Sequence, residues 1–429
     1  MKYRKLWTGA AATAVALSLA ACSPSESAPD ADGDAGGDVE AGTVRMWVME
    51  GSLTDESQEL LVEEFAAENP GSELKIEVQQ WDGIVSKLQT ALASKNESPD
   101  LVEIGNTQTT TFTSVGAFAD ITDLKESLGG EDLIPSFVEA SSVDGAIYAY
   151  PFYAGARGVF YRVDLFEEAG IDVPETIEEF HDAVIDLQAA NPEDVEDFSG
   201  MYLAAVDPHG VESYLFSRGF EYAAEEGGEW VGKTSSPESL QALTDLQELF
   251  TDGTTYALDS QAGQKSFERY FNEGTTGVLI GTGNIGTKID EELWDEDKVG
   301  VFAIPSEEPG VPGKTFAGGS NIALAANSQN PELATKALEV IFAEEFQRQL
   351  ADEGWVPGNT SFGDDVSGPF GDIAADIISN SKLTPNSPEW GVEFAGAQLN
   401  ELFTRIAKGE DVEAVATAFD DEINASLNK

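Results

Sequence analysis

The sequence predicts an α/β protein of two lobes, with mostly parallel sheets covered by helices on both faces. Two observations lead to this prediction. Runs with the period-two pattern of strands alternate with runs that have the apolar spacing of helices, as in βαβ units. The chain also has 429 residues, more than a single hydrophobic core usually holds, so a division into two lobes is expected.

The first half of the chain alternates three strands with helices. Strands are expected at residues 43–48, 74–78 and 101–104, with helices at 55–69 and 84–94. The turns that follow parallel strands lie at one edge of the sheet, where open α/β sheets bind ligands. These turns carry carboxylate, indole and amide groups, which suit a ligand rich in hydroxyls. The candidate binding residues there are Glu50, Trp81, Asn106 and Gln108. For Trp81, a buried core position is the alternative.

Residues 147–162 form a stretch around which the two halves are organised. Two β-rich runs are joined by a segment that holds one proline, two glycines and Arg157, beside the aromatic residues Tyr150, Phe152 and Tyr153. We interpret residues 154–158 as a strand crossing from one lobe to the other, with Tyr153 and Arg157 at the floor of a cleft. An edge strand with a bulge, its aromatic side chains in the core, is the alternative.

The second half repeats the alternation. Strands are expected at 200–206, 276–280 and 299–304, and helices at 174–190, 240–250, 331–343, 392–408 and 412–427. The turn after the first of these strands carries Asp207 and His209. Residues 316–321, which include a glycine pair followed by Ser320 and Asn321, are a second candidate crossing.

Residues 281–286 match the pattern G-x-G-x-x-G, follow a strand and open a helix, as in a dinucleotide site. However, the next strand ends in Pro305 with no acidic residue for a ribose, and the run lies deep in the second half. We therefore interpret the run as a glycine turn that lets Asn284 and backbone N–H groups face a ligand.

The N-terminus has the features of a secretory leader. Three basic residues precede an apolar run that stops at Leu19-Ala20-Ala21-Cys22, similar to a bacterial lipobox. We predict a signal peptide at 1–21, a lipid-modified Cys22 and a flexible acidic tether over 22–42. An ordinary signal peptide with an incidental cysteine is the alternative. Cys22 is the only cysteine, which excludes a disulfide within one chain.

The chain carries a formal charge of −56, which argues against binding to nucleic acid or to an anionic membrane surface. It holds only two histidines, His181 and His209, and no G-x-S-x-G motif, so neither a serine hydrolase nor a metal site is well supported. We expect no cofactor, no metal ion and a monomer.

Several short segments, taken in order behind the lipobox-like motif, carry a family likeness. They are residues 65–71, 88–100, 116–122, 148–151, 161–171 and 327–334. In these segments the chain resembles the extracellular solute-binding proteins of carbohydrate ABC importers, the family that includes maltose-binding protein. The resemblance implies a type II periplasmic-binding-protein-like fold with strand hinges and a ligand cleft between the lobes. It implies an N-terminal lobe of 43–153 plus 317–378 and a C-terminal lobe of 154–316 plus 379–429.

The resemblance also implies roles for single residues. Asn106, Gln108, Asp207 and His209 fall in loops that contact sugar in the family. Asn284 lies where many members have a glycine-proline-tryptophan turn, and here the tryptophan is missing. Trp390 matches a frequent aromatic platform, while Trp355 has either a binding or a packing role.

We therefore predict a non-catalytic receptor that captures an extracellular carbohydrate, most simply an oligosaccharide, by lobe closure and delivers it to the permease subunits of an ABC transporter. The predicted binding residues are Glu50, Trp81, Asn106, Gln108, Tyr153, Arg157, Asp207, His209, Asn284, Ser320, Asn321, Trp355 and Trp390. One alternative is a peptide or polyamine binder that uses carboxylates such as Glu50, Glu103 and Asp207. Another is a secreted glycosidase with paired carboxylates.

Overall fold

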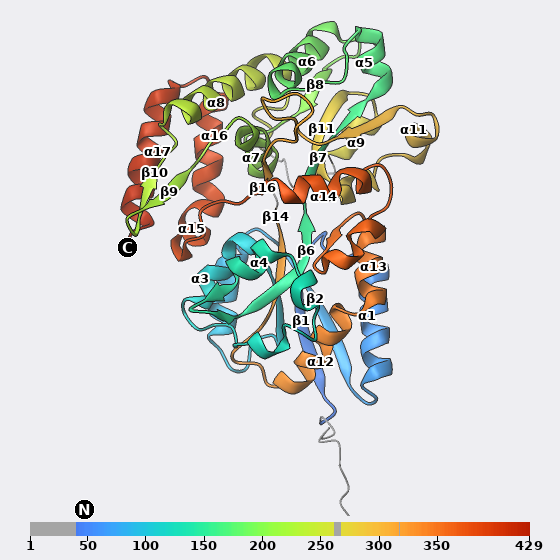
Figure 1. Ribbon diagram of the computed structural model, residues 1–429, viewed down its shortest axis with the longest axis vertical. Coiled ribbons are helices and arrows are strands. Elements are labelled where there is room, and N and C mark those ends of the chain that lie inside the picture. Colours follow the sequence, from blue (N-terminus) through green and yellow to red (C-terminus); the bar gives the residue numbers. More distant parts are fainter. Residues whose placement is uncertain (1–39, 261–266, 317) are drawn as a thin grey trace, which may run out of the picture. The chain divides into compact units, whose positions relative to one another are not determined.

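The computed structural model describes residues 40–260, 267–316 and 318–429, which belong to one compact unit, Glu40–Lys429. The predicted leader, Cys22 and nearly all of the tether lie outside the described residues. Within this unit the chain builds two main sheets, each flanked by helices (Figure 1). The predicted α/β class with two lobes is confirmed.

The first sheet has six strands in the order β15-β6-β14-β3-β1-β2. The strands are β1 Thr43–Met49, β2 Glu73–Gln79, β3 Leu101–Gly105, β6 Ala149–Gly155, β14 Gly318–Leu324 and β15 Val356–Pro357. β1 is parallel to β2 and β3, whereas β14 is antiparallel to both β3 and β6.

Helices cover this sheet with apolar stripes that the sequence pattern predicts. In α1 (Asp55–Glu68) Leu61 and Phe65 are buried, and the hydroxyl of Thr54 caps the helix by accepting from the Ser57 N–H. The buried side of α2 (Ile84–Leu92) packs in one apolar cluster with side chains of β1 and β3. The other helices of this part are α3 Thr109–Thr113, α4 Pro135–Ala140, α12 Pro331–Ile341 and α13 Glu344–Asp352.

The second sheet has four strands in the order β12-β7-β11-β8. They are β7 Arg157–Arg162, β8 Ser199–Tyr202, β11 Thr276–Thr282 and β12 Val299–Phe302. β8 and β11 are parallel, and β7 is antiparallel to β11 and β12. The prediction of mostly parallel sheets is therefore wrong at β14, β15 and β7. β7 follows directly on β6 of the first sheet, and β14 follows the segment Thr315–Phe316 outside that sheet, so each begins at the edge where its neighbours end.

The second sheet is embedded in the larger apolar core. This core combines side chains of α6, α7, α8, α16 and α17 with those of the sheet. The helices are α5 Val163–Ala169, α6 Ile177–Ala190, α7 Pro208–Ser217, α8 Pro237–Glu248, α9 Glu268–Asn272, α10 Gly283–Gly286, α11 Glu291–Asp295, α14 Gly371–Ser379, α15 Pro388–Glu393, α16 Leu399–Ala407 and α17 Val412–Ser426. Small two-stranded sheets are formed by β4 Ser142–Val143 with β5 Ala146–Ile147, β9 Ala223–Glu226 with β10 Glu229–Gly232, and β13 Thr315–Phe316 with β16 Ser381–Lys382.

The chain passes directly between the two sheets at β6 and β7. Only Ala156 separates β6 in the first sheet from β7 in the second. On the way back, a single residue separates β13 from β14. A connection of one residue confines any rotation of one sheet against the other to a few backbone dihedrals, as in a hinge. Both passages fall within the predicted crossings.

The packing of α14 differs from the predicted division of the chain. The predicted boundary after residue 378 places α14 with the first lobe, but α14 packs against β7 of the second sheet. The ring of Phe370 stacks on Phe160 with centroids 6.0 Å apart, and Ile373 and Ile377 lie against Gly158. Turn signals and helix periodicity do not encode which of two adjacent apolar faces a helix covers, so the boundary was not readable from the sequence.

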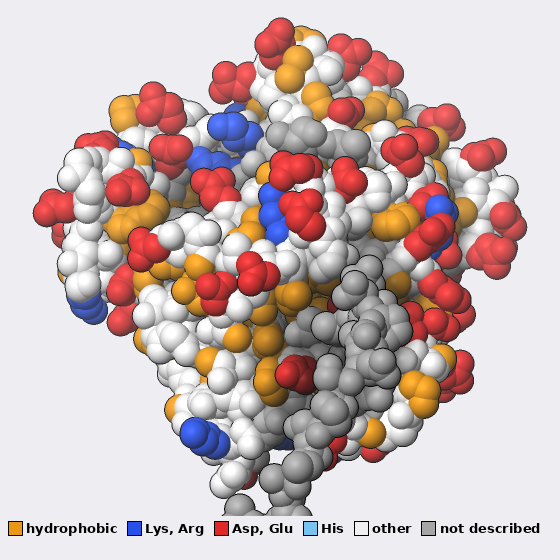
Figure 2. Space-filling model, turned by 60° about the horizontal axis from the view of Figure 1, so that its bottom comes forward, with side chains coloured by type: hydrophobic (Ala, Val, Ile, Leu, Met, Phe, Trp, Pro, Cys, Tyr) orange, Lys and Arg blue, Asp and Glu red, His pale blue; other side chains and the backbone are white. Residues whose placement is uncertain are grey.

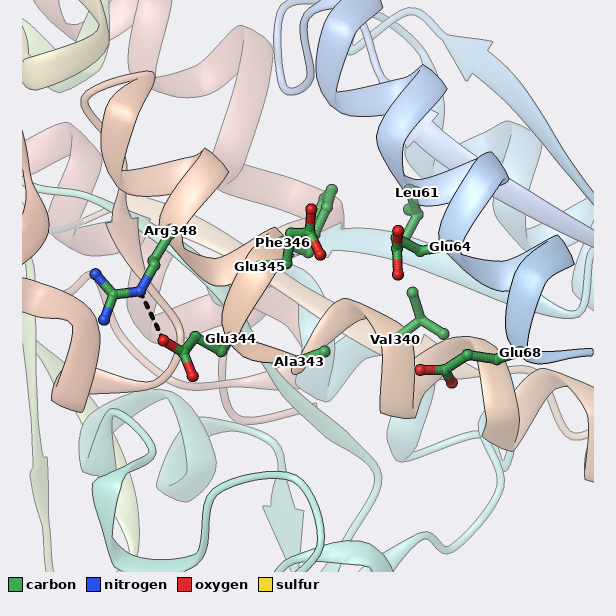
Figure 3. A pocket seen from close by; sticks show the side chains of 9 residues that line it. All are labelled: Leu61, Glu64, Glu68, Val340, Ala343, Glu344, Glu345, Phe346 and Arg348. Atoms are coloured by element: carbon green, nitrogen blue, oxygen red, sulfur yellow. Dashed lines mark hydrogen bonds and ion pairs between the residues drawn. The ribbon is translucent and has the colours of Figure 1, made fainter.

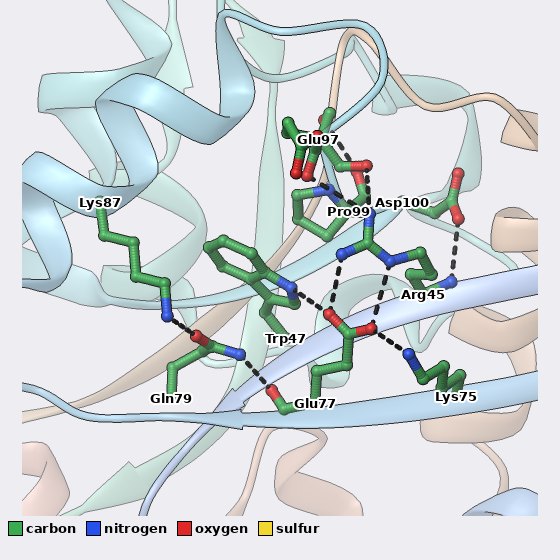
Figure 4. A network of polar contacts seen from close by, with 10 residues as sticks. Arg45, Trp47, Lys75, Glu77, Gln79, Lys87, Glu97, Pro99 and Asp100 are labelled. Carbon is green, nitrogen blue, oxygen red and sulfur yellow. Dashed lines mark hydrogen bonds and ion pairs between the residues drawn. The ribbon is translucent and has the colours of Figure 1, made fainter.

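A polar network ties the outer end of the first sheet together (Figure 4). The Glu77 carboxylate on β2 accepts hydrogen bonds from Arg45, Trp47 and Lys75, at 2.8 Å from Arg45 Nη2 and 2.8 Å from Trp47 Nε1. Hydrogen bonding to Arg45 lowers the pKa of Glu77 to about 2. The network thus connects β1 to the edge strand β2 through charged groups that are ionised at neutral pH.

The surface carries many acidic side chains. Figure 2 shows Asp and Glu side chains spread over the visible face, with few Lys and Arg among them. This distribution agrees with the composition, which has 79 acidic and 23 basic residues. Among residues 40–260, 267–316 and 318–429, none of the helices has the length and apolar character needed to cross a bilayer.

Candidate functional site

A cavity of about 470 Å³ lies where the ends of the two sheets meet. Its size falls within the range of small-molecule sites, about 300–1,000 Å³. The loops after β1, β2 and β3 form one side, the loop before α7 and the end of β11 form the other, and the passages β6–β7 and β13–β14 contribute between them. The predicted site residues that line the cavity are Glu50, Trp81, Asn106, Gln108, Tyr153, Arg157, Asp207, His209, Asn284, Ser320 and Trp355.

The loops of the first sheet supply an indole face and amides. Trp81 is 41% exposed, so its ring is not a core residue but is open to solvent and to the cavity. Gln108 lies beside it, because both side chains approach the same point next to Gly105. The Gln108 Oε1 is buried and has no hydrogen-bond partner within the described part of the chain. An acceptor in this state is available to a ligand that donates a hydrogen bond.

Two aromatic residues pack against each other on the first-sheet side of the passages. The rings of Tyr153 on β6 and Trp355 have centroids 4.3 Å apart. The Trp355 Nε1 is buried without a hydrogen-bond partner among the residues that the structure describes. Within the described residues, the cavity wall thus offers an unpaired donor at Trp355 and, in the loop after β3, an unpaired acceptor at Gln108. Hydroxyl groups of a ligand suit both atoms, because a hydroxyl can donate and accept.

Arg157 is the cation of the cavity wall. It opens β7, its Nη1 donates to the carbonyl of Gly155 at 3.2 Å, and its guanidinium lies 5.3 Å from the ring centroid of Phe316. Burial lowers the pKa of the guanidinium, and the nearby carboxylates of Asp207 and Glu212 act in the opposite direction. Because the ordinary pKa of an arginine lies far above 7, the Arg157 guanidinium stays charged at neutral pH.

His209 stacks on the same aromatic ring as Arg157. Its imidazole lies parallel to the Phe316 ring, with centroids 4.2 Å apart and an interplanar angle of 5°. Its Nδ1 lies 2.9 Å from the Glu212 carboxylate, which is fully buried and also accepts from the Tyr222 hydroxyl at 2.9 Å. Glu212 thus fixes the orientation of the imidazole at the cavity.

Asn284 is the second residue of α10, the short helix that follows β11 directly, as the glycine turn suggested. Its side chain is 7% exposed and its Nδ2 donates to the carbonyl of Glu353 at 3.2 Å. Asn284 therefore joins the end of the second sheet to the segment that leads into β15, while it also lines the cavity.

Two predicted site residues do not line the cavity. Trp390 is 1% exposed and packs in the large core, with ring centroids 5.0 Å from Tyr222 and 5.1 Å from Phe394. The prediction of an aromatic platform at Trp390 is wrong in this structure, because the whole indole is enclosed by apolar neighbours. Asn321 is fully buried, and its Nδ2 donates to the Thr109 hydroxyl at 3.1 Å. Ser320 and Asn321 are consecutive residues of β14, so their side chains point to opposite faces of the sheet and only Ser320 lines the cavity.

The sequence reasoning missed several cavity residues. The stacked ring of Phe316 and the hydroxyl of Ser52 line the cavity, as do Thr107 and Thr282. The glycine pair after Phe316 marked the passage, but nothing in the local sequence indicated that the buried Phe316 ring forms part of the cavity wall. The charged Glu103 within the apolar run of β3 was noted only as a carboxylate for a cationic ligand. It is fully buried and does not line the cavity.

A second hollow of about 500 Å³ lies among α1, α12 and α13 (Figure 3). Its polar lining consists of four glutamates and Arg348, whose Nε donates to Glu344 at 3.0 Å. Its one aromatic lining residue, Phe346, is 1% exposed. Among its described lining residues there is no amide and no open aromatic face, so this hollow has hydrogen-bonding groups but no ring on which an apolar face of a ligand could stack.

The fold and the cavity define a two-lobed ligand-binding protein. The family model described as bacterial extracellular solute-binding protein matches residues 50–348. The chain belongs to this family.

Among its relatives, the diacetylchitobiose binding protein DasA of Streptomyces coelicolor is 31% identical over 431 residues, covering 99% of each chain. A lactose-binding protein of Rhizobium radiobacter is 23% identical and covers 89% of this chain and 92% of its own. Among solved structures, the GacH receptor of Streptomyces glaucescens, studied unliganded and with acarbose, aligns with a TM-score of 0.77 at 19% identity. That alignment covers 90% of this chain and 99% of GacH.

Proposed function

We propose that the chain is a non-catalytic receptor that binds an extracellular oligosaccharide in the cavity between its sheets and delivers it to an ABC-type permease. One observation carries the proposal: the cavity places an exposed indole face at Trp81 together with an unpaired acceptor at Gln108 and an unpaired donor at Trp355. Sugars present apolar C–H faces and hydroxyls that both donate and accept, so they match this arrangement.

The charged residues of the cavity extend the match. Carboxylates of Glu50 and Asp207 accept from hydroxyls, while the guanidinium of Arg157 donates. The proposal assigns ligand contact to these residues and to His209, Asn284 and Ser320, as the sequence predicts.

Capture follows from lobe closure. The cavity is lined from both sheets, and the direct passage between them at β6 and β7 is one residue long. A ligand that contacts both sides favours the closed arrangement by its differential contacts, so closure reports occupancy to the permease.

The names of the relatives suggest which sugar to test first. The relative that matches along almost the whole chain is named for binding diacetylchitobiose, a disaccharide with two acetamido groups. We propose an N-acetylated disaccharide as the first candidate ligand, with a monomeric receptor that needs no cofactor.

A thermal-shift panel tests the proposal. The panel holds diacetylchitobiose, maltose, lactose, mannitol and an arabino-oligosaccharide, with spermidine and a basic peptide as the competing class. We expect one sugar to raise the melting temperature in a concentration-dependent manner, because a ligand bound only to the native state stabilises it. Stabilisation by spermidine or the peptide and by none of the sugars would refute a carbohydrate receptor.

We further propose that Cys22 carries a lipid that anchors the receptor to the outer face of the cell membrane. The proposal is supported by the leader and the small residues before Cys22. Two acyl chains would hold a protein whose net charge of −56 repels anionic lipid. Labelled palmitate should be incorporated by the wild type and not by Cys22→Ala, which should appear in the medium. Equal membrane retention of the variant would contradict the anchor.

A further inference from the structure

Glu103 lies directly behind the cavity, with its side chain 0% exposed. Its Oε1 accepts from the hydroxyls of Ser52 and Tyr153 at 2.7 Å each and of Ser320 at 2.6 Å. Its Oε2 accepts from the backbone N–H of Met49 at 2.7 Å. The three hydroxyl residues line the cavity and Glu103 does not. One carboxylate therefore joins the end of β1, the turn after it, β6 and β14 at the wall of the candidate site.

The number of hydroxyl protons in this cluster determines whether the cavity wall donates or accepts hydrogen bonds. Each hydroxyl has one proton, and an ionised carboxylate can only accept. The hydroxyls also lie close to one another, with Tyr153 Oη 2.7 Å from Ser52 Oγ and 3.3 Å from Ser320 Oγ. When the hydroxyl protons point to Glu103, the oxygens keep their lone pairs for groups on the cavity side.

We propose that Glu103 is a positioning residue that sets the hydrogen-bond polarity of the cavity wall. It holds the hydroxyl protons of Ser52, Tyr153 and Ser320, so that these oxygens accept from a ligand that donates. The matching ligand groups are sugar hydroxyls and acetamido N–H groups. The inference rests on the proposed carbohydrate binding and adds a selectivity for donors at this wall.

The variant Glu103→Gln reverses this polarity with almost no change of shape. The backbone N–H of Met49 can pair only with the amide oxygen, so the NH₂ group of glutamine faces the three hydroxyls and donates its two protons to two of them. The hydroxyls then turn their protons toward the cavity. We expect the affinity to fall roughly 10- to 100-fold, because donors then face donors in a buried site.

The matched control is Glu77→Gln. Glu77 is also an acidic residue of the first sheet that accepts from several donors, but it lies on β2 and does not line the cavity. Its variant should bind with wild-type affinity. A second variant, Ser320→Ala, removes one acceptor and should bind roughly 3- to 10-fold more weakly. It tests the same wall should Glu103→Gln fail to fold.

A pH series separates positioning from a structural role. Burial raises the pKa of the Glu103 carboxyl, and the hydrogen bonds that it accepts oppose this shift. Among the described groups that contact Glu103 from β1, β6, β14 and the turn, the titratable one is Tyr153, whose pKa burial raises well above its usual value. A protonated carboxyl carries a donor, as glutamine does. The affinity ratio of wild type to Glu103→Gln should therefore shrink as the pH is lowered and the Glu103 carboxyl takes up a proton.

The experiment is calorimetric titration of each variant with the panel sugar that binds the wild type most tightly, and diacetylchitobiose is tested first. Thermal melting of each variant shows whether it is folded. Weakened binding by folded Glu103→Gln, with a pH-dependent ratio and an unaffected Glu77→Gln, supports the inference. Wild-type affinity in Glu103→Gln or in Ser320→Ala overturns the inference and leaves the proposed function standing, as does a ratio that stays constant with pH. If no panel sugar binds the wild type, the proposed function and this inference both fall.

Discussion

Replacing Trp81 by alanine should weaken sugar binding without lowering the stability of the fold. Trp81 is 41% exposed at the edge of the cavity, so a large part of the ring surface that the substitution removes is surface that the folded chain leaves open. Aromatic anchors at binding sites contribute about 1–3 kcal/mol, which corresponds to an affinity loss of roughly 5- to 150-fold. The melting temperature of the ligand-free variant should stay close to that of the wild type.

Trp390 provides the matched control because it is the same residue type in the opposite environment. It is 1% exposed and stacks on Phe394 in the core, so Trp390→Ala leaves a cavity and should cost roughly 3–5 kcal/mol of stability. The affinity of the protein that remains folded should change little.

Calorimetric titration with the panel sugar, together with thermal melts, measures both quantities for each variant. The reasoning fails if Trp81→Ala binds like the wild type. It also fails if Trp390→Ala keeps its melting temperature while it loses affinity, since the core indole would then be acting as a ligand platform.

Three further outcomes are expected. The bond to Arg45 depresses the pKa of Glu77 to about 2 in the folded chain, against 4.5 ordinarily. This contribution is complete above about pH 4.5 and is lost as the pH falls toward 2. The free energy of unfolding of Glu77→Gln should therefore fall less than that of the wild type as the pH is lowered, by roughly 1 kcal/mol for this partly exposed pair. Unfolding monitored by circular dichroism at a series of acidic pH values measures this difference. Gly283→Ala should lower the melting temperature, because a Cβ there would lie 2.3 Å from the Gly354 carbonyl oxygen, whereas Gly363→Ala, which meets nothing within 4 Å, should not. Raising the salt concentration from about 0.05 to about 0.5 M should raise the melting temperature, since screening weakens repulsion within a chain of net charge −56; an unchanged melting temperature would contradict this.

The sequence predicts this fold well wherever one periodic pattern dictates both an element and its surroundings. The strand-helix alternation predicted β1, β2 and β3 with their helices, and the turns after them do meet at a cavity. The direction of β14 and β7 was not predictable in this way, because it depends on which sheet the preceding segment leaves.

The candidate site shows the same limit at the level of single side chains. Trp81 and Trp390 both follow turn-like segments, yet one ring is open and the other is enclosed. The difference arises from the packing of α15, which places Trp390 against Tyr222, a residue far away in the sequence. Local spacing carries no information about such a tertiary contact. Which of the neighbours Ser320 and Asn321 faces the cavity is likewise set by the pairing of β14 with β3 and β6.

The glycine-rich run at residues 281–286 has a physical explanation that needs no nucleotide. In a dinucleotide site, glycines let a backbone approach a pyrophosphate. Here the close approach is to the protein itself: a Cβ on Gly283 would overlap the carbonyl of Gly354, and a Cβ on Gly286 would lie 2.8 Å from the Phe160 ring. Gly354 has a φ of +79°, so it is also constrained as a glycine. The run therefore brings the end of β11 against the segment before β15, where Asn284 donates to Glu353 at the edge of the cavity. The same pattern that suggests a phosphate cradle from sequence serves, in this fold, to bring the two sheets together around the ligand cavity.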